Sequence, residues 1–149
     1  MTGTIQDQSR EKRMSQAYKD YNAFVRQIQI TDIRIVSAKV DNLDCSYVPS
    51  SAEVKWKTKA RYENTEQAFR VFQRYDVVIV DKESTEIKAK ISVTFCVTYS
   101  SKIPMNDEFF KTFIRANLPV NTWPYFREFA HNTVLRMNWP PFIAPIFVP

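Results

Sequence analysis

Few side chains of this 149-residue chain are of a type and spacing that could do chemistry. His131 is the only histidine, and the apolar residues around it have helical spacing. Cys45 and Cys96 are the only cysteines, and they lie too far apart in sequence to form a metal-binding motif. A nucleophile also needs an activating partner, and the sequence indicates none. We therefore expect no catalytic residues, no metal and no cofactor.

Composition excludes several further classes of site. Glycine occurs once, at position 3, so a glycine-rich phosphate loop or dinucleotide motif is impossible. The acidic residues are scattered, and no pair of them is spaced as an acid and a base. The segment 1–13 is polar, unlike a signal peptide, and no apolar run approaches the ~20 residues of a membrane span. We expect a cytoplasmic protein with two free thiols, although a single disulfide remains an alternative.

The most regular charged feature is an alternating row of four basic residues, namely Lys55, Lys57, Lys59 and Arg61. Alternate residues of a strand point to the same face, so this row predicts a basic face on a sheet. Other residues of matching predicted parity would enlarge it: Arg70, Phe72, Arg74, Lys88 and Lys90. Such a face is either solvated or a docking surface for an anionic partner. Nucleic acid is the less favoured partner, because only one aromatic residue is predicted there.

The elements that must position these residues follow from hydrophobic periodicity. Four strands are predicted in succession, at 27–40, 53–62, 69–80 and 87–99, with turn residues at 41–51. The odd-numbered apolar residues from Phe69 to Ile79 and from Ile87 to Tyr99 should face a core. In the first strand the apolar parity switches near Asp32, which indicates a β-bulge or a change of buried face. Pairing Tyr62 with Phe69 across a turn near Asn64 would place Lys57 opposite Arg74.

Helices flank the strands in the predicted order. Residues 1–10 are expected to be a disordered tail, followed by an amphipathic helix at 11–26 that should pack onto the body. Asn106 is expected to cap a first C-terminal helix, and Asn121 or Thr122 a second that ends before Trp139. The prediction is an α+β fold in which a four-stranded antiparallel sheet carries helices on one face. Residues 11–149 should form a single domain.

The C-terminal helices carry more apolar surface than one small sheet face can cover. The first helix has the stripe Phe109, Phe110, Phe113 and Ile114, which we interpret as an oligomer interface. The second has the stripe Trp123, Phe126, Phe129, Ala130, Val134 and Met137, and an apolar segment follows it. The surplus predicts contact with another subunit or with a bound polypeptide.

The last third of the chain resembles the SecB family of protein-export chaperones and SecB-like chaperones. The resemblance rests on N-T-W-P-Y-F-R-E-F at 121–129, V-L-R-M at 134–137 and W-P-P-F-I-A-P at 139–145. The family has an aromatic-Pro-Tyr step followed by Arg-Glu, then a helix, an aromatic-Pro pair and a short apolar stretch that ends in Ala-Pro. Four strands followed by helices is also the family's order, so the resemblance spans residues 25–147.

The resemblance implies a function. SecB-type proteins are holdase chaperones that use no ATP, assemble as a dimer of dimers, and bind unfolded polypeptides in grooves beside the first crossover. Carried over to this chain, the crossover is 41–51, and the implied peptide-binding residues are Leu43, Tyr47, Val48, Phe126, Phe142, Ile143, Ile146 and Phe147. The clients would be preproteins for export or unstable antitoxins. The resemblance therefore implies a tetramer with polypeptide clients.

Three features depart from the family. SecB proteins are acidic and dock a SecA motor through an acidic sheet face, whereas this chain carries a net charge of +5. A SecA-type partner is therefore not expected. The family usually continues with a further C-terminal helix, and it has no counterpart of the helix at 11–26. Two alternatives remain open: a module that binds nucleic acid or an acidic partner through the basic face, and a carrier of a small apolar ligand.

Overall fold

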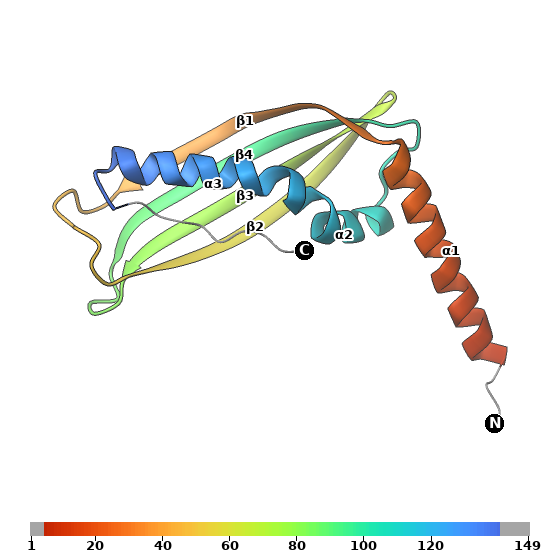
Figure 1. Cartoon of the computed structure of the whole chain (residues 1–149), viewed down its shortest axis with the longest axis horizontal. Coiled ribbons are helices and arrows are strands. Elements are labelled where there is room, and N and C mark those ends of the chain that lie inside the picture. The colour runs from red at the N-terminus through yellow and green to blue at the C-terminus, as the bar shows by residue number, and fades with distance from the viewer. Residues whose placement is uncertain (1–4, 141–149) are drawn as a thin grey trace.

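The computed structural model describes residues 5–140. In chain order the elements are α1 (Ile5–Gln27), β1 (Gln29–Asn42), β2 (Ala52–Thr65), β3 (Ala68–Asp81), β4 (Ile87–Ser100), α2 (Asp107–Ala116) and α3 (Leu118–Arg136). The strands form one antiparallel sheet in the order β1-β4-β3-β2. Helix α3 lies along one face of this sheet, and α2 lies near one end of it (Figure 1). The predicted α+β architecture is confirmed.

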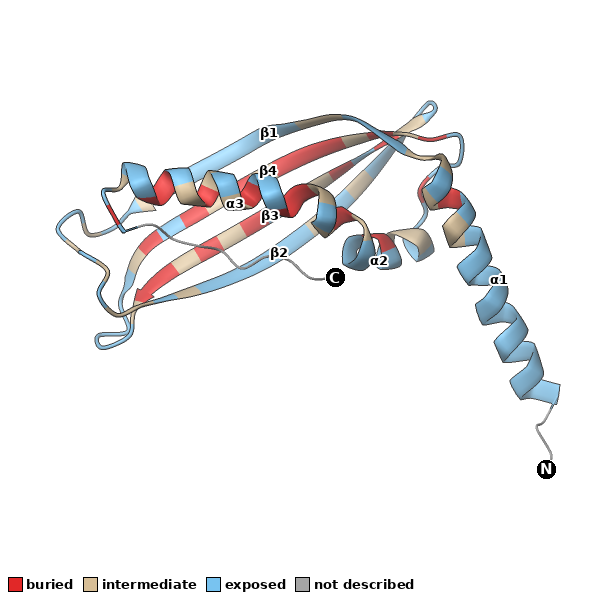
Figure 2. Ribbon diagram, in the orientation of Figure 1, coloured by how far each residue is buried: buried red, intermediate tan, exposed pale blue. Residues whose placement is uncertain are grey.

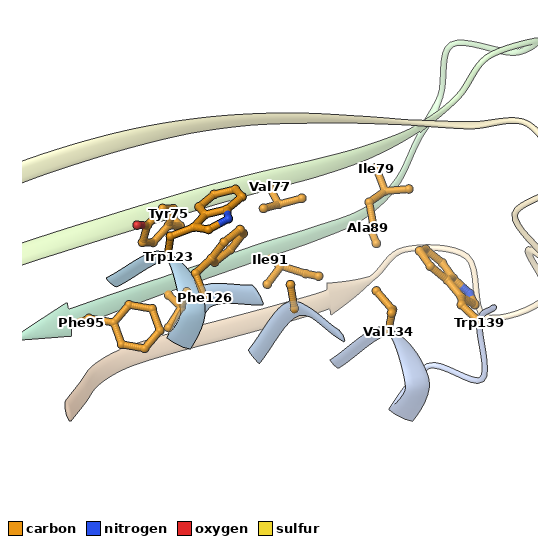
Figure 3. Packing of buried hydrophobic residues seen from close by; sticks show 12 residues of the cluster. Tyr75, Val77, Ile79, Ala89, Ile91, Phe95, Trp123, Phe126, Val134 and Trp139 are labelled. Atoms are coloured by element: carbon orange, nitrogen blue, oxygen red, sulfur yellow. The ribbon is translucent and has the colours of Figure 1, made fainter. Parts of the chain in front are cut away.

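The main core lies between α3 and the central strands. Alternate residues of β3 and β4 are buried, as their sequence pattern predicts, while the residues between them are more exposed (Figure 2). On α3, Trp123, Phe126 and Val134 are buried against them. Figure 3 shows Trp123 and Phe126 beside Tyr75, and Val134 further along the helix near Trp139. The ring of Phe126 stacks on that of Tyr75 with centroids 4.3 Å apart. The apolar stripe predicted for this helix is therefore the stripe that covers the sheet.

A second core closes one end of the sheet. Phe69 stacks on Tyr99 with ring centroids 4.9 Å apart, and Phe113 of α2 packs edge-on against both rings. Helix α2 begins where predicted, because the Asn106 side chain accepts a hydrogen bond of 2.8 Å from the backbone N–H of Phe109. This cap fixes the direction in which α2 leaves the sheet.

The start of α3 differs from the sequence prediction. The helix begins at Leu118 with Pro119 in its first turn, where a missing backbone N–H costs nothing. Asn121 and Thr122, expected as caps, therefore lie inside the helix. The Asn121 amide donates to the Tyr99 hydroxyl at 2.8 Å, and the Thr122 hydroxyl lies 2.6 Å from that of Tyr75. Both side chains bond to buried tyrosines of the sheet instead of capping the backbone.

Strand β1 contains the irregularity that its sequence indicates. Its register against β4 shifts between Ile30 and Asp32, so the parity switch near Asp32 is a β-bulge. A second shift, between Ile35 and Ser37, was not predicted. Each shift lets apolar residues return to the inner face after one residue has been skipped.

The register of the β2–β3 hairpin is two residues away from the predicted one. Thr65 pairs with Ala68, so the turn consists of Glu66 and Gln67, and Gln67 has a φ of 54°. A two-residue hairpin turn needs positive φ, which is commonly supplied by glycine or asparagine, and no such signal stands there. The consequence is that Lys57 lies opposite Asp76 and not opposite Arg74, so the predicted like-charge pair is replaced by an opposite-charge pair.

A bulge at Lys88 also turns the start of β4. Ile79 pairs with Ala89 but Val80 pairs with Ile87, so Lys88 is skipped. Because one extra residue inverts the alternation, Ile87 joins Val80 on the outer face and is 43% exposed. The expectation that Ile87 faces the core is therefore wrong.

Helix α1 is longer and less packed than predicted. It begins at Ile5, so residues 5–10, expected to be a disordered tail, belong to the helix. Phe24 at its C-terminal end is buried, whereas Met14 and Tyr18 are 67% and 69% exposed. The helix projects away from the sheet (Figure 1), and the expectation that it packs onto the body holds only for its last turn. Burial of Phe24 and a hydrogen bond from the Tyr21 hydroxyl to Asn117 anchor that turn.

Candidate functional site

The crossover between β1 and β2 presents apolar side chains to solvent. Leu43 and Val48 are 55% and 68% exposed. Tyr47 lies between them and is half-buried: its hydroxyl donates to Asp81 Oδ1 at 2.9 Å, and its ring meets that of Trp139 edge-on at 6.0 Å. Tyr47 therefore holds the crossover on the body, while Leu43 and Val48 remain available for contact.

A cavity of about 180 Å³ lies beside this crossover. Its lining is mainly apolar and comes from the crossover, from β2 and β3, and from the end of α3: Pro49, Ala52, Val54, Ile79, Val134, Trp139 and Pro140. Sequence reasoning did not assign Trp139 to this wall, although the aromatic-Pro pair at 139–140 was visible in the sequence. The cavity and the exposed crossover side chains together form what we call the crossover groove.

The remaining implied peptide-binding residues are Phe126 and four residues of the C-terminal tail. Phe126 is 2% exposed and stacked on Tyr75, so it belongs to the core and cannot line an open groove. Its position on the buried stripe of α3 is the physical reason, since residues three and four apart share one helix face. The tail residues Phe142, Ile143, Ile146 and Phe147 lie outside the described residues.

Polar contacts tie the crossover to the β3–β4 hairpin. Asp81 accepts a hydrogen bond from the backbone N–H of Ser84 at 2.9 Å as well as the bond from Tyr47. These bonds lower the pKa of the Asp81 carboxyl to about 2. The Lys88 ammonium lies 3.2 Å from Asp44 and 3.0 Å from Glu86. Lys88 is thus paired at the end of the sheet and does not belong to the predicted docking face.

A second groove runs between edge strand β1 and α3, and sequence reasoning missed it. It encloses about 290 Å³, and its lining is mixed: Ile33, Ile35, Phe95, Tyr125 and Phe129 are apolar, and Arg34, Glu128, Asn132, Thr133 and Arg136 are polar or charged. Ile35 and Tyr125 are each 47% exposed. The signal was present in the odd-numbered isoleucines after the bulge and in the four-residue spacing of Tyr125 and Phe129. We call this the β1–α3 groove.

The residues proposed as an oligomer interface are mostly used within the chain. Phe113 is fully buried, and Phe109 and Phe110 are half-buried against Phe24 and Tyr62. Ile114 alone is classed as exposed, at 36%. The interface prediction is therefore wrong for Phe113, because the apolar stripe of α2 packs against the end of the sheet.

The basic face is present on the side of the sheet opposite α3. Seven of its eight predicted basic residues are exposed, namely Lys55, Lys57, Lys59, Arg61, Arg70, Arg74 and Lys90. Phe72 is half-buried beneath the Arg61 guanidinium, which lies 3.9 Å from the ring centroid. This outer face is hollowed in two places, of about 520 and 400 Å³.

The potential metal ligands and the thiols of the described residues are dispersed. Within residues 5–140, no group of three or more His, Cys, Asp or Glu side chains is placed to hold a metal ion. Cys45 is exposed and Cys96 is buried, and both are free thiols. Among the helices of this part of the chain, none is long and apolar enough to cross a membrane.

Comparison with solved structures assigns the fold to the SecB-like chaperones. The structure matches the SecB-like chaperone of Mycobacterium tuberculosis in complex with a ChAD peptide from the HigA1 antitoxin. The TM-score is 0.71, and the match covers 87% of this chain and 98% of the mycobacterial one at 16% sequence identity. No family model and no curated protein sequence matches the chain. The SecB-like fold expected from the C-terminal motifs is therefore confirmed by structure.

Proposed function

We propose that this protein is a cytoplasmic, non-enzymatic holdase that binds unfolded polypeptide segments without ATP. The observation that carries the proposal is the crossover groove on a SecB-like fold: Leu43 and Val48 are exposed on the crossover, and Val48 directly precedes Pro49, which lines the apolar cavity. An unfolded client offers exposed apolar side chains, and their transfer from water into such a groove is favourable. The function needs no reacting group, which agrees with a surface built from aliphatic and aromatic residues.

The size of the groove sets the affinity of one site. Complete burial of one client Leu or Phe side chain contributes about 1.5–3 kcal/mol. One or two such contacts give a dissociation constant of only about millimolar order, since 1 mM corresponds to about 4.1 kcal/mol. A useful holdase must therefore engage one client at several sites. Linking such sites on one particle raises the overall affinity by about a hundredfold or more.

We infer that the several sites come from a homo-oligomer, with a tetramer as the expected form. Strand β1 is an edge strand of 14 residues, so its outer backbone N–H and C=O groups have no partner strand within residues 5–140. Beside it lies the β1–α3 groove, where Ile35, Tyr125 and nearby Val40 are each more than 40% exposed. A second copy paired along β1 would satisfy the backbone groups and bury these side chains.

The clients we propose are unstable segments such as those of antitoxins, or preproteins before export. The antitoxin class is supported by the mycobacterial chaperone, whose complex contains an antitoxin peptide. Export through a SecA motor is the less favoured route. The family's docking face for SecA is acidic, and the corresponding face here is basic.

The test is suppression of aggregation of a chemically denatured client on dilution, without ATP. The variant Leu43→Ser/Val48→Ser should suppress aggregation markedly less than the wild type while its circular dichroism is unchanged, because both side chains are exposed. Ile5→Ser is the matched control, since Ile5 is 83% exposed at the far end of α1. Full activity of the double variant, or no suppression by the wild type at stoichiometric amounts, would contradict the proposal.

A further inference from the structure

The outer face of the sheet consists of four central rows of residues that lie side by side across the strands. Directly paired residues of antiparallel strands point to the same face, so each row can be followed from β1 to β2. The rows are Arg34–Cys96–Phe72–Arg61, Ser37–Thr94–Arg74–Lys59, Lys39–Ser92–Asp76–Lys57 and Asp41–Lys90–Val78–Lys55. These positions include eight Lys or Arg residues and two Asp residues. The middle of the face is therefore strongly positive, whereas the flanking row Asp32–Thr98–Arg70–Glu63 carries two acidic residues and one basic residue.

Part of this charge is balanced and part is not. The Arg34, Arg61 and Arg74 guanidiniums pair with carboxylates two residues away on their own strands, at 2.6, 2.8 and 3.0 Å. The amino groups of Lys55, Lys59 and Lys90 form no ion pair with any carboxylate of residues 5–140. Lys57 lies opposite Asp76, whose carboxylate is already bonded to Arg74 and Ser92. The unbalanced charge thus lies mainly on β2, with Lys90 on β4.

Apolar side chains lie within this basic field. Val78, Val80 and Ile87 line the larger hollow beside Trp56, and its charged lining combines three lysines with three carboxylates, namely Lys55, Lys57, Lys82, Glu53, Asp76 and Asp81. Val36 and Phe72 line the smaller one together with Lys59, Arg61 and Arg74. Val78 and Phe72 are six residues apart on β3, which corresponds to about 20 Å along a strand. The two hollows therefore form two apolar contact points separated by a ridge of positive charge.

We propose that this outer face docks an acidic polypeptide segment of a partner protein, with two apolar anchor side chains about 20 Å apart. Carboxylates of the segment would meet the unpaired lysines of β2, and its anchors would enter the two hollows. The anchors would be about six residues apart in an extended segment, or about 13 apart in a helix. This site is on the opposite face from α3, so it is independent of client binding in the crossover groove.

The chemistry of the face favours this occupant over two others. Single-stranded nucleic acid needs free aromatic platforms for base stacking, but Phe72 is covered by Arg61, and Trp56, the aromatic residue of the larger hollow, already packs on the Trp123 ring with centroids 4.8 Å apart. A second copy packed face to face would bring two positive fields together, which is unfavourable. An acidic peptide satisfies both the charge and the aliphatic hollows.

The test uses a fluorescent Glu-rich peptide carrying two Leu residues about six positions apart, with binding measured by anisotropy. Lys55→Glu/Lys59→Glu should weaken binding at least about tenfold, because both lysines are unpaired and two attractions become repulsions. These positions face Val78 and Arg74, so neither change sets two carboxylates opposite each other. The matched control, Lys12→Glu/Lys19→Glu, makes the same change of charge on the exposed helix α1 and should bind as the wild type does.

Further arms separate the alternatives. Replacing both Leu residues of the peptide with Ser should weaken binding, and raising the salt concentration should weaken it further. Suppression of client aggregation by the Lys55→Glu/Lys59→Glu variant should be unchanged, which separates failure here from failure of the holdase function. Equal binding by the variant and the wild type would overturn the proposal. So would tighter binding of a single-stranded DNA of equal charge, or an equal loss in the α1 control.

Discussion

Phe126 provides the sharpest separation between a core residue and a client-binding residue. The family resemblance implies that it lines the client groove, whereas the structure buries it at 2% exposure between Tyr75 and Trp123, with ring centroids 4.3 and 5.3 Å away. We predict that Phe126→Ala acts on stability. Removing a buried Phe side chain leaves a cavity and costs about 3–5 kcal/mol of unfolding free energy.

The measurements are urea unfolding, for the free energy, and thermal unfolding, for the melting temperature, both followed by tryptophan fluorescence and circular dichroism. At about 2–4 °C per kcal/mol for a protein of this size, the melting temperature should fall by about 6–20 °C. All samples must have equal protein concentration, because association would itself contribute to apparent stability. Phe126→Leu is the matched control: it refills much of the cavity and should recover most of the loss.

The opposite pattern, in which Phe126→Ala leaves stability nearly unchanged but abolishes suppression of client aggregation, would refute the assignment of Phe126 to the core. A Phe126→Ala protein that loses less than about 1 kcal/mol of stability, yet no longer suppresses client aggregation below its melting temperature, would place Phe126 in the client groove. The Leu43→Ser/Val48→Ser variant provides the reference, since exposed substitutions change stability by about 0.5 kcal/mol or less each.

Two further predictions concern the sheet edge and the acid range. Ile35→Lys should lower the mass measured by light scattering toward that of the 17.6 kDa monomer, because it places a charge in the β1–α3 groove. The control Ile103→Lys changes an exposed isoleucine on a loop and should leave the mass unchanged. An oligomer of unchanged mass in both variants would refute the β1 interface. Asp81 has a pKa of about 2 in the folded chain and about 3.9 when unfolded, so its stabilising contribution is complete above about pH 4 and is lost as the pH falls toward 2. Asp81→Asn should therefore flatten the stability profile between pH 4 and 2, and an unaltered profile would contradict the bonds from Ser84 and Tyr47.

The sequence correctly predicts those elements in which the spacing of apolar residues matches the residues that are buried in the fold. The alternation in β3 and β4 identifies the core because one face is covered along its length by α3, and Asn106 is recognisable as a cap because its side chain bonds locally. The stripe of α1 does not predict packing. Its spacing fits a buried helix, but α1 projects away from the sheet (Figure 1), and Met14 and Tyr18 are exposed because nothing within residues 5–140 covers them.

Register was harder to predict than strand position. The β2–β3 turn rests on Gln67 at positive φ and carries no glycine or asparagine, so its position cannot be recognised from residue type. Lys88 forms a bulge that looks like one more member of an alternating strand. Both errors alter which residues meet across the outer face, and they explain why the basic face was predicted but its pairing and its hollows were not.

The two proposed surfaces meet at β3, where Ile79 and Val80 are consecutive residues. Ile79 points toward α3 and lines the crossover groove, whereas Val80 points outward and lines the larger hollow of the basic face. A client and an acidic partner can therefore be bound at the same time, separated by the thickness of one sheet. Because the strand is rigidly paired on both sides, neither site has to open the core to be occupied. This arrangement suits a chaperone that holds its client on one face and is recruited by a partner through the other.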